Sequence, residues 1–588
     1  MRDILIFDIE TDGLDVDTAQ MKWFGAYSYK TDKYYLLDYN KIDEIKNLIK
    51  SHKILIGFNN KNFDQPILEN NLEIDFTYKV IIDLYEISAP RSGKEYGKYN
   101  KNKLVQMGFK LKKYTLDNIS SLLKLDNESK GKIDYKIFQK DNWSEEEVIE
   151  IEKYLKQDII LTKKLFEWYE EQFAPLKTFL SKEEVNKLYH IKSSLASLAY
   201  RIICNKANLP IEWDDRPITR EKSFSGGHHI ENRWNKVKGN IIEIDFTSAY
   251  PHALMMGNLY SPQENGWEGN NYYKIDGTYN KDSPGKIESA LKEVFLERLK
   301  AKKNKETAKD KSYKIIINSL YGLTGNPKFK SIYNKTTASD CTSIVRTWMK
   351  KLAKELEEND FVCLYGFTDS IFVKIPEQSN KEELMFLVNK CLDKFKINLP
   401  FPMETFRMDI EEELKFIWFV AKNCYLFVTK DNEVKYKSTL LNQNTPKVIL
   451  KLFEEYIKPN IIESLDVKFT LSELKKEIDK ILLNNPQLAE EEYKVDELNN
   501  YKVKTSIHYQ VSKRYGSGRH FLIPNIRNIG VGKSKTTKNK VGVRYCTYEE
   551  FVNKGLSIND IDKNQLIKHV KVFITKPEQR TLEEVVEK

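Results

Sequence analysis

Short apolar segments alternate with amphipathic, Lys- and Glu-rich segments over the first 170 residues. The apolar runs 4–7, 34–37 and 54–58 have the length and composition of buried strands. Charged segments with helical spacing follow them, and this alternation predicts an α/β unit. After a helical stretch and a Gly-containing loop in 175–235, the pattern predicts a strand over 241–246.

The central and C-terminal parts have a different pattern. Helical spacing over 286–304 and 309–321 predicts a helical hairpin whose turn falls in the Lys-rich segment 302–311. The apolar runs 361–365 and 371–375 are separated by a few residues and predict a β-hairpin. Residues 447–500 are Lys- and Glu-rich and are predicted to be helical.

Composition narrows the class of protein. At roughly 150 residues per domain, 588 residues suggest about four domains or subdomains. With 31% charged and 40% hydrophobic residues, the chain is neither a membrane protein nor disordered. The first residues carry no signal-peptide pattern, and six widely spaced cysteines without a CxxC pair indicate reduced thiols. We therefore expect a cytoplasmic protein without a zinc module or disulfide framework.

The net charge of +9 is unevenly distributed along the sequence. Residues 498–548 contain no Asp or Glu but eleven Lys and Arg, among them Lys513 and Arg514, with aromatic residues interleaved. Such a basic and aromatic stretch suits a nucleic-acid backbone. A merely solvated basic surface is the alternative, although ordinary surfaces mix both signs.

A first set of carboxylates falls in three short segments. Asp8 and Glu10 end an apolar strand and, by strand alternation, leave the same face. Asn60 and Asp64 are four residues apart, as are Tyr154 and Asp158, so each pair is predicted to share a helical face. Four converging carboxylates would repel one another unless divalent cations held them. Two Mg²⁺ or Mn²⁺ ions in such a site could activate water for phosphodiester hydrolysis.

A second set combines aspartates with a cationic helical hairpin. Asp245 ends the predicted strand 241–246, and Asp369 lies at the tip of the predicted β-hairpin. Between them, helical spacing puts Lys314, Asn318 and Tyr321 on one face, with Gly322 as a plausible C-cap, and puts Arg298 and Lys302 on one face of the preceding helix. These cations suit a triphosphate, while the two aspartates could hold two metal ions for in-line nucleotidyl transfer.

The three segments of the first set resemble the exonuclease motifs of the DEDD 3′–5′ exonuclease superfamily, in its tyrosine-bearing form. The resemblance implies that Asp8, Glu10, Asp64 and Asp158 bind metal and that Tyr154 orients the attacking water. It also implies that Asn60 and Phe63 contact the single-stranded 3′ end.

The second set resembles family B DNA polymerases, in order along residues 4 to about 440. Residues 245–251 resemble motif A, 314–322 match motif B (Lys-x-x-x-Asn-Ser-x-Tyr-Gly) and 365–370 resemble motif C. Segment 224–227 resembles the Tyr-x-Gly-Gly template-binding loop, and 421–425 resembles the Lys-x-Tyr primer motif. The resemblance implies nucleotide-binding roles for Arg298, Lys302, Lys314, Asn318, Tyr321, Tyr250 and Ser248. It implies DNA-binding roles for Phe224, Gly226, Gly227, Lys422, Tyr425 and Lys437.

The expected fold is accordingly multidomain, α/β and α+β, with an RNase H-like exonuclease domain followed by a right-hand polymerase domain. We expect the exonuclease domain over 1–180, the linker and first palm segment over 181–285, and the fingers over 286–345. The second palm segment is expected over 346–445, and the thumb with the basic C-terminal region over 446–588.

The implied activity is template-directed addition of dNTPs to a primer 3′ end, with proofreading, using two Mg²⁺ or Mn²⁺ ions per site. The partners would be primer-template DNA and dNTPs, with no membrane, and we expect a monomer. The exonuclease motif begins at residue 8, without the long N-terminal domain of cellular enzymes, which is similar to compact polymerases of phages and linear plasmids. Only 69 residues separate Asp245 from Lys314, which leaves little room for the insertion by which that subgroup engages its terminal protein. We expect a virus-encoded replicase, with its priming mode, terminal protein and other replication partners open.

The sequence departs from the family at three positions. Phe367 replaces the first Asp of motif C, Phe224 replaces the Tyr of the linker loop, and Asn423 replaces a Lys of the primer motif. Phe367 and Asn423 support an alternative, a nuclease or DNA-binding accessory protein whose polymerase site has decayed. The retained Asp245, Asp369 and hairpin cations argue against it.

Overall fold

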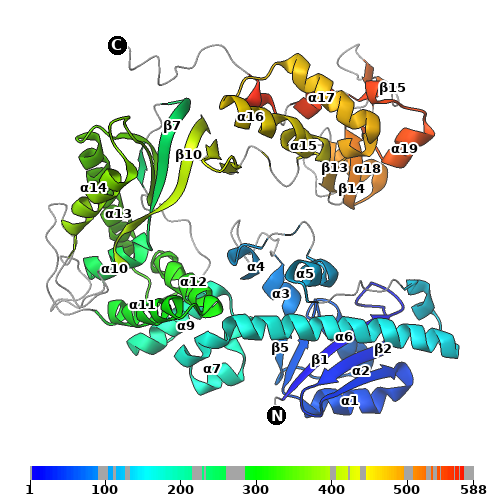
Figure 1. Cartoon of the computed structure of the whole chain (residues 1–588). Coiled ribbons are helices and arrows are strands. Elements are labelled where there is room, and N and C mark those ends of the chain that lie inside the picture. Colours follow the sequence, from blue (N-terminus) through cyan, green and yellow to red (C-terminus); the bar gives the residue numbers. More distant parts are fainter. Residues whose placement is uncertain are drawn as a thin grey trace. The chain divides into compact units, whose positions relative to one another are not determined.

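The computed structural model comprises two compact units, which are described one at a time (Figure 1). The described residues are 3–89, 103–109, 111, 114–125, 133–214, 228–230, 234–259, 285–396, 405–421, 424–437, 441, 445–495, 507–524, 531–533, 540–542, 545–561, 563–567 and 570–574. The first unit comprises Met1–Gly226, Ser248–Ile344 and Lys396–Glu404, and the second comprises Gly227–Thr247, Val345–Phe395 and Thr405–Lys588.

The first unit begins with a five-stranded mixed sheet in the order β3-β2-β1-β4-β5. Its strands are β1 (Ile4–Thr11), β2 (Met21–Ser28), β3 (Lys33–Asp38), β4 (Ile54–Gly57) and β5 (Val80–Asp83). β1 pairs antiparallel with β2 and parallel with β4, and it is buried almost throughout. Helices α1 (Ile42–Ser51) and α2 (Asp64–Leu72) pack on this sheet through one apolar core. The predicted α/β unit is confirmed.

The long helix α6 (Glu145–Phe173) packs against β1 and β2 and begins with a capping box at Ser144 and Glu147. Its approach depends on Gly25 of β2, because a Cβ there would lie 2.6 Å from Cγ of Leu155. Shorter helices complete this part of the unit: α3 (Leu84–Ser88), α4 (Lys103–Gln106), α5 (Leu116–Leu123), α7 (Lys182–Asn186), α8 (Tyr189–Lys192) and α9 (Leu195–Ala207).

The remaining described elements of the first unit are helices. α10 (Ala249–Gly257) follows Ser248, and the predicted helical hairpin is confirmed as α11 (Lys286–Lys303) and α12 (Thr307–Thr324). The turn between the two helices is shorter than the predicted turn segment 302–311, because α11 ends at Lys303 and α12 begins at Thr307. α13 (Lys335–Glu357) then begins in the first unit and ends in the second.

The second unit contains a seven-stranded sheet in the order β12-β11-β10-β7-β9-β8-β6. The strands are β6 (His228–Ile230), β7 (Lys236–Phe246), β8 (Val362–Thr368), β9 (Ser370–Lys374), β10 (Met408–Ala421), β11 (Cys424–Thr429) and β12 (Val434–Lys437). The predicted hairpin is confirmed as β8 and β9. A cluster of aromatic side chains, including Tyr365, Phe372 and Tyr425, is buried in this sheet.

The C-terminal part of the second unit packs on β10 and β11 through a large apolar core. It contains α15 (Lys447–Leu452), a π-helical turn (Phe453–Ile457), α16 (Lys458–Ser464), α17 (Leu471–Asn484), α18 (Ile507–Tyr515), α19 (Tyr548–Asn553) and α20 (Lys563–Ile567). The strands are β13 (Glu491–Val495), β14 (Gly518–Pro524) and β17 (Tyr545–Cys546) in one sheet, and β15 (Val531–Lys533) with β16 (Lys540–Gly542) in another. α14 (Lys381–Asp393) lies earlier in the unit.

Three local predictions were wrong. Asn60 does not lie on a helix with Asp64, because Asn59 has a positive φ of 65° and the chain turns before α2 begins at Asp64. Gly322 does not cap α12, which continues to Thr324 because Leu323 is buried. Residues 447–500 are not wholly helical, because the buried Tyr493 and Val495 alternate along β13, which pairs with β14.

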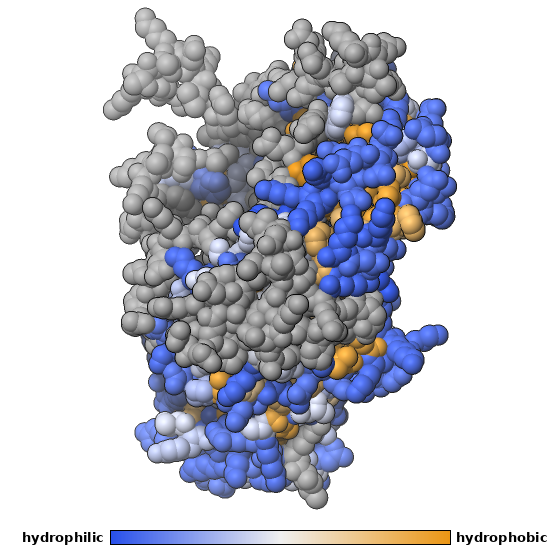
Figure 2. All heavy atoms as spheres, turned by 90° about the vertical axis from the view of Figure 1, so that its left-hand side faces the viewer, coloured by the Kyte–Doolittle hydropathy of each residue, from blue (hydrophilic) through white to orange (hydrophobic). Residues whose placement is uncertain are grey.

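No helix among the described residues is long and apolar enough to cross a membrane. On the face seen in Figure 2, the hydrophobic residues form small separate patches among hydrophilic ones.

The close contact between Gly25 and Leu155 generates a testable prediction. Gly25→Ala should lower the free energy of unfolding by about 1–3 kcal/mol, because Leu155 is fully buried and cannot move aside freely. Leu155→Ala alone should cost about 2–5 kcal/mol through the cavity it leaves. In the double variant the new methyl group occupies part of that cavity, so urea unfolding should show a loss smaller than the two single losses together.

The matched control is Gly13→Ala, whose Cβ would meet nothing closer than 3.9 Å. It should change the stability by no more than about 0.5 kcal/mol. Strictly additive losses in the Gly25 and Leu155 variants would contradict the proposed contact.

Candidate active sites

The first carboxylate set comes together at the end of β1. One carboxylate oxygen from each of Asp8, Glu10 and Asp158 lies within 4.8 Å of the others. β1 directs Asp8 and Glu10 to one face, and α6 supplies Asp158. Three such oxygens form a ligand set suited to a hard divalent cation such as Mg²⁺ or Mn²⁺. Among the described residues, this is the only such group of three or more acidic, His or Cys side chains.

Asp64 lies beside this cluster but is not a member of it. Its Oδ1 accepts a hydrogen bond of 3.1 Å from the backbone N–H of Ile9, between the two acidic residues of β1. Burial and, to a smaller extent, the neighbouring charge of Asp83 raise the pKa of Asp64 to about 7, although backbone N–H groups oppose this shift. The structure thus gathers three of the four predicted metal ligands, while the fourth, Asp64 of α2, is hydrogen-bonded to the same strand.

Tyr154 lies one helical turn before Asp158, as predicted, and is 8% exposed. Its hydroxyl is 2.9 Å from the hydroxyl of Tyr135, a residue that the sequence analysis did not identify. Burial and the charge of Asp158 both raise the pKa of Tyr154, so its hydroxyl keeps its proton. It can therefore donate a hydrogen bond to an oxygen nucleophile near Asp158.

Asn60 is fully buried, and Phe63 packs on the core of the five-stranded sheet. The side chain of Asn60 packs directly against the backbone of residue 57. This requires glycine there, because a Cβ on Gly57 would lie 2.7 Å from Cβ of Asn60. The sequence analysis missed the role of Gly57, since only the fold reveals this contact. The predicted contacts of Asn60 and Phe63 with a 3′ end stay predictions.

In the second unit, Asp245 and Asp369 lie at the same end of neighbouring strands. Asp245 pairs with Ser370 across β7 and β9, and the N–H of Phe246 donates to the carbonyl oxygen of Asp369 at 3.0 Å. Asp369 lies in the tight turn between β8 and β9, next to Thr368 with its φ of 63°. Burial raises the pKa of Asp369 to about 6, while the charge of Lys437 opposes this shift.

Three further charged residues near this pair were missed by the sequence analysis. Glu243 precedes Asp245 by two residues on β7, and burial raises its pKa to about 7. Strand alternation alone could have placed it on the face of Asp245. Asp409 of β10 is opposite Asp245 in the register and forms an ion pair with Arg407. No local motif identifies Asp409 or Arg407, because both are distant in the sequence from Asp245.

Phe367, the departure in motif C, has a defined environment. The ammonium of Lys437 lies 4.8 Å from the centre of its ring and 5.6 Å from that of Tyr425. A cation near an aromatic face is stabilised by the ring's quadrupole. Phe367 therefore helps to hold Lys437 in the charged environment of Asp369.

The predicted nucleotide-binding residues lie in the first unit. Arg298 donates to Asp310 at 2.9 Å and to the hydroxyl of Ser248 at 3.1 Å. Tyr250 and Tyr321 stack with their ring centres 4.3 Å apart. Lys302, Lys314 and Asn318 are exposed, and Lys314 and Asn318 line a cavity of about 580 Å³ together with Trp168 and Phe109.

The predicted DNA-binding residues have different surroundings. Tyr425 is only 3% exposed in the aromatic cluster, which does not favour contact of its ring with a primer, whereas Lys437 is exposed. Lys513 is exposed, and Arg514 pairs with Glu550 at 2.8 Å. Phe224, Gly226, Gly227 and Lys422 lie outside the described residues, as do Asn423 and much of the basic segment 498–548.

The chain matches two family profiles. Residues 5–170 match the RNase H superfamily, and residues 289–521 match DNA polymerase family B. The chain is similar to a protein named DNA polymerase from Thermococcus gorgonarius, with 24% identity over 79% of this chain and 63% of that protein. It is also similar to DNA polymerase 1 of Pyrococcus abyssi, with 26% identity over 66% of this chain and 54% of that protein. The chain thus spans less than two thirds of these relatives' length.

A solved structure has a similar fold. It is described as the family B DNA polymerase from the hyperthermophilic archaeon Pyrobaculum calidifontis, with a TM-score of 0.56 at 15% identity over 98% of this chain and 78% of that chain.

The carboxylate cluster should bind a divalent cation, and this can be measured without activity. In EDTA, Asp158→Asn should raise the melting temperature, because it removes one of three like charges held within 4.8 Å. Mn²⁺ at a hundred times its dissociation constant should stabilise the native chain by about 2.7 kcal/mol, and the variant should lose most of this response.

Glu150→Gln is the control, because Glu150 is an exposed acid on the same helix, α6. It should keep the Mn²⁺ response. An Asp158→Asn variant that still responds fully to Mn²⁺ would show that the cluster is not the ion site.

Proposed function

Because the chain belongs to DNA polymerase family B and carries an RNase H-like exonuclease domain at its N-terminal side, we propose that it copies a DNA template and removes nucleotides from 3′ ends. The observation that carries this proposal is the presence of two separate acidic centres. One is the cluster of Asp8, Glu10 and Asp158 in the first unit, and the other is the Asp245 and Asp369 pair in the second.

The trimming reaction follows from the first centre. Divalent cations bound there would lower the charge on the scissile phosphate and activate a water molecule. Asp8, Glu10 and Asp158 supply the carboxylates that hold such ions, and the N–H of Ile9 fixes Asp64 beside them. The protonated hydroxyl of Tyr154, oriented by Tyr135, is placed to hold the attacking oxygen.

The polymerase reaction would use the second centre for the metal ions and the cations of the helical hairpin for the nucleotide, as the family resemblance implies. Asp245 and Asp369 would hold the metal ions, and Arg298, Lys302 and Lys314 would neutralise the triphosphate of the incoming dNTP. The hydrogen bond between Arg298 and Ser248 and the stacking of Tyr250 on Tyr321 lie within the first unit and support this assignment for the nucleotide, because they bring the predicted nucleotide-binding residues together. Primer-template DNA and dNTPs are the partners that the proposal implies.

Primer extension with Mg²⁺ and all four dNTPs tests the polymerase reaction, and degradation of a 3′-labelled single strand without dNTPs tests the nuclease. Failure of extension with intact trimming would favour the alternative, a nuclease or DNA-binding accessory whose polymerase site has decayed.

We also propose, more specifically, that the genome copied is that of a virus or mobile element. The short spacing of 69 residues between Asp245 and Lys314 supports a compact enzyme, although the relatives described above are archaeal. A coding sequence surrounded by housekeeping genes on a cellular chromosome would contradict this part of the proposal.

The two centres should be separable by mutation. Asp8→Ala combined with Glu10→Ala should abolish 3′ trimming and leave primer extension within about threefold, because Asp245 and Asp369 lie in the other compact unit. Asp369→Ala should have the reverse effect. Loss of both activities in a double variant with native circular dichroism would show that the centres are not independent.

Phe367 distinguishes an active polymerase site from a decayed one. Phe367→Asp should alter the extension rate by less than about tenfold, because the new carboxylate would pair with Lys437 instead of completing a missing ligand set. Asp369→Ala should lose several kcal/mol of transition-state stabilisation, at ~1.4 kcal/mol per tenfold in rate. Single-turnover extension measures both.

The control is Asp431→Ala, an exposed residue between β11 and β12, which should extend at the native rate. A hundredfold gain in Phe367→Asp would mean that the natural site is crippled, and the decayed-polymerase alternative would then be preferred.

A further inference from the structure

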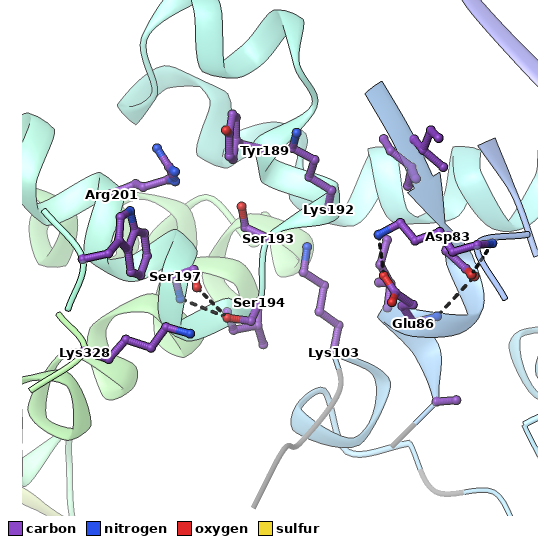
Figure 3. A pocket seen from close by; sticks show the side chains of 17 residues that line it. Asp83, Glu86, Lys103, Tyr189, Lys192, Ser193, Ser194, Ser197, Arg201 and Lys328 are labelled. Atoms are coloured by element: carbon purple, nitrogen blue, oxygen red, sulfur yellow. Dashed lines mark hydrogen bonds and ion pairs between the residues drawn. The ribbon is translucent and has the colours of Figure 1, made fainter. Parts of the chain in front are cut away.

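A second cavity lies in the first unit, between the five-stranded sheet and the helices that follow α6 (Figure 3). Its volume is about 530 Å³, within the range of small-molecule sites. One side is formed by β5 and α3, and the other by α8 and the start of α9. None of its lining residues belongs to the carboxylate cluster or to the predicted polymerase residues.

Cationic side chains outnumber acidic ones in this cavity. The cations are Lys61, Lys103, Lys192, Arg201 and Lys328, and the acids are Asp83 and Glu86. Both acids already have partners. Glu86 pairs with Lys61 at 2.7 Å, and the carboxylate of Asp83 accepts backbone N–H groups of residues 59, 61, 85 and 86. The acids of the cavity are therefore not positioned to balance the other cations.

Three lysines of the cavity lack a carboxylate partner among the described residues. Lys192 and Lys328 form no ion pair there, and Lys192 has a lowered pKa because of burial and of repulsion by Lys187, Arg201 and Lys61. Lys103 is buried, which lowers its pKa well below the usual lysine value, and its amino group donates to the carbonyl oxygens of His190, at 2.8 Å, and Ile191. This unrelieved repulsion would be reduced by an anionic ligand.

Hydrogen-bond donors lie beside these cations. Ser194 caps α9, a helix of 13 residues, and in the view of Figure 3 Ser194 and Ser197 lie between Lys328 and Lys103. The start of a helix presents N–H groups and a partial positive charge, which favour phosphate. Arg201 donates to Glu184 through Nη1 at 2.8 Å, while its buried Nε has no hydrogen-bond partner.

Two aromatic residues line the same cavity. Tyr189 and Trp213 flank the guanidinium of Arg201, whose central carbon lies 4.1 Å and 5.7 Å from their ring centres. The Tyr189 ring is also covered by the ammonium of Lys192, 4.3 Å from its centre, so Trp213 is the aromatic residue that offers ring surface of the kind on which a nucleobase packs.

We propose that this cavity is a nucleotide-binding site that takes the polyphosphate of a nucleoside triphosphate and is built from residues other than the carboxylates of the two acidic centres. Several cations without acidic partners suit a ligand with several closely spaced negative charges. A single-stranded nucleic acid has one charge per nucleotide and would bring too few phosphates into the cavity to balance them. Ser194 already donates its hydroxyl proton to Ser197 at 2.9 Å, so the hydroxyl of Ser197 and the Nε of Arg201 supply donors to the phosphate oxygens. Trp213 supplies a surface for the base.

The test measures binding and does not depend on either proposed activity. The full chain, in EDTA, is titrated against a fluorescent nucleoside triphosphate and followed by anisotropy, with inorganic triphosphate and oligo(dT) as competitors. Lys192→Ala combined with Lys328→Ala should weaken nucleotide binding at least tenfold, because two charge-assisted contacts are lost. The cations of α11 and α12 are intact in this variant, so the loss reports the cavity alone.

The matched control is Lys46→Ala combined with Lys50→Ala, two lysines one turn apart on α1 that form no ion pair among the described residues. It should bind like the native chain. Equal affinity in the native and cavity variants would overturn the proposal, as would a loss seen only for oligo(dT). Lys103→Met provides a second, buried probe, and a folded Lys103→Met variant with native affinity would count against the site.

Discussion

Electrostatic repulsion between carboxylates held close together is the constraint on which the first acidic centre depends. Asp8, Glu10 and Asp158 lie within 4.8 Å of one another, a geometry that is unfavourable for isolated charges. The fold maintains it because the residues around them on β1 are buried and because α6 packs closely over Gly25. Burial of apolar side chains thus supplies the free energy that holds the three carboxylates close together. A bound cation would reduce the repulsion between them.

Much of this could be predicted from the sequence, for a local reason. Strand alternation places Asp8 and Glu10 on one face, and helical spacing places Tyr154 one turn before Asp158. Such relations depend only on the backbone of one element, so the predicted strands, the helical hairpin and the β-hairpin are confirmed. The predicted domain bounds and the roles of the site residues stay predictions.

The wrong predictions and the missed residues depend on more than the residue spacing within one element. Asn60 was placed on a helix because four-residue spacing fits a helix, but the left-handed backbone of Asn59 makes a turn there instead. Gly322 was taken for a cap because glycine often ends helices, yet the burial of Leu323 extends α12 beyond it. Asp409 and Tyr135 approach the centres through pairing or packing with distant segments. No pattern within a single element could have revealed them.

The two centres differ in how their charge is compensated. Beside the first, burial and Asp83 raise the pKa of Asp64 to about 7, and only backbone N–H groups oppose this. In the second, Lys437 lowers the pKa values of both Asp369 and Glu243, which burial would otherwise raise further. Because the ammonium of Lys437 already supplies positive charge there, the second centre depends less on a bound metal ion for its stability. The aromatic face of Phe367 helps to hold that cation. Where the family has a carboxylate in motif C, this chain therefore has a ring that positions the positive charge of Lys437 near Asp369. A loss of function does not follow from the sequence change alone.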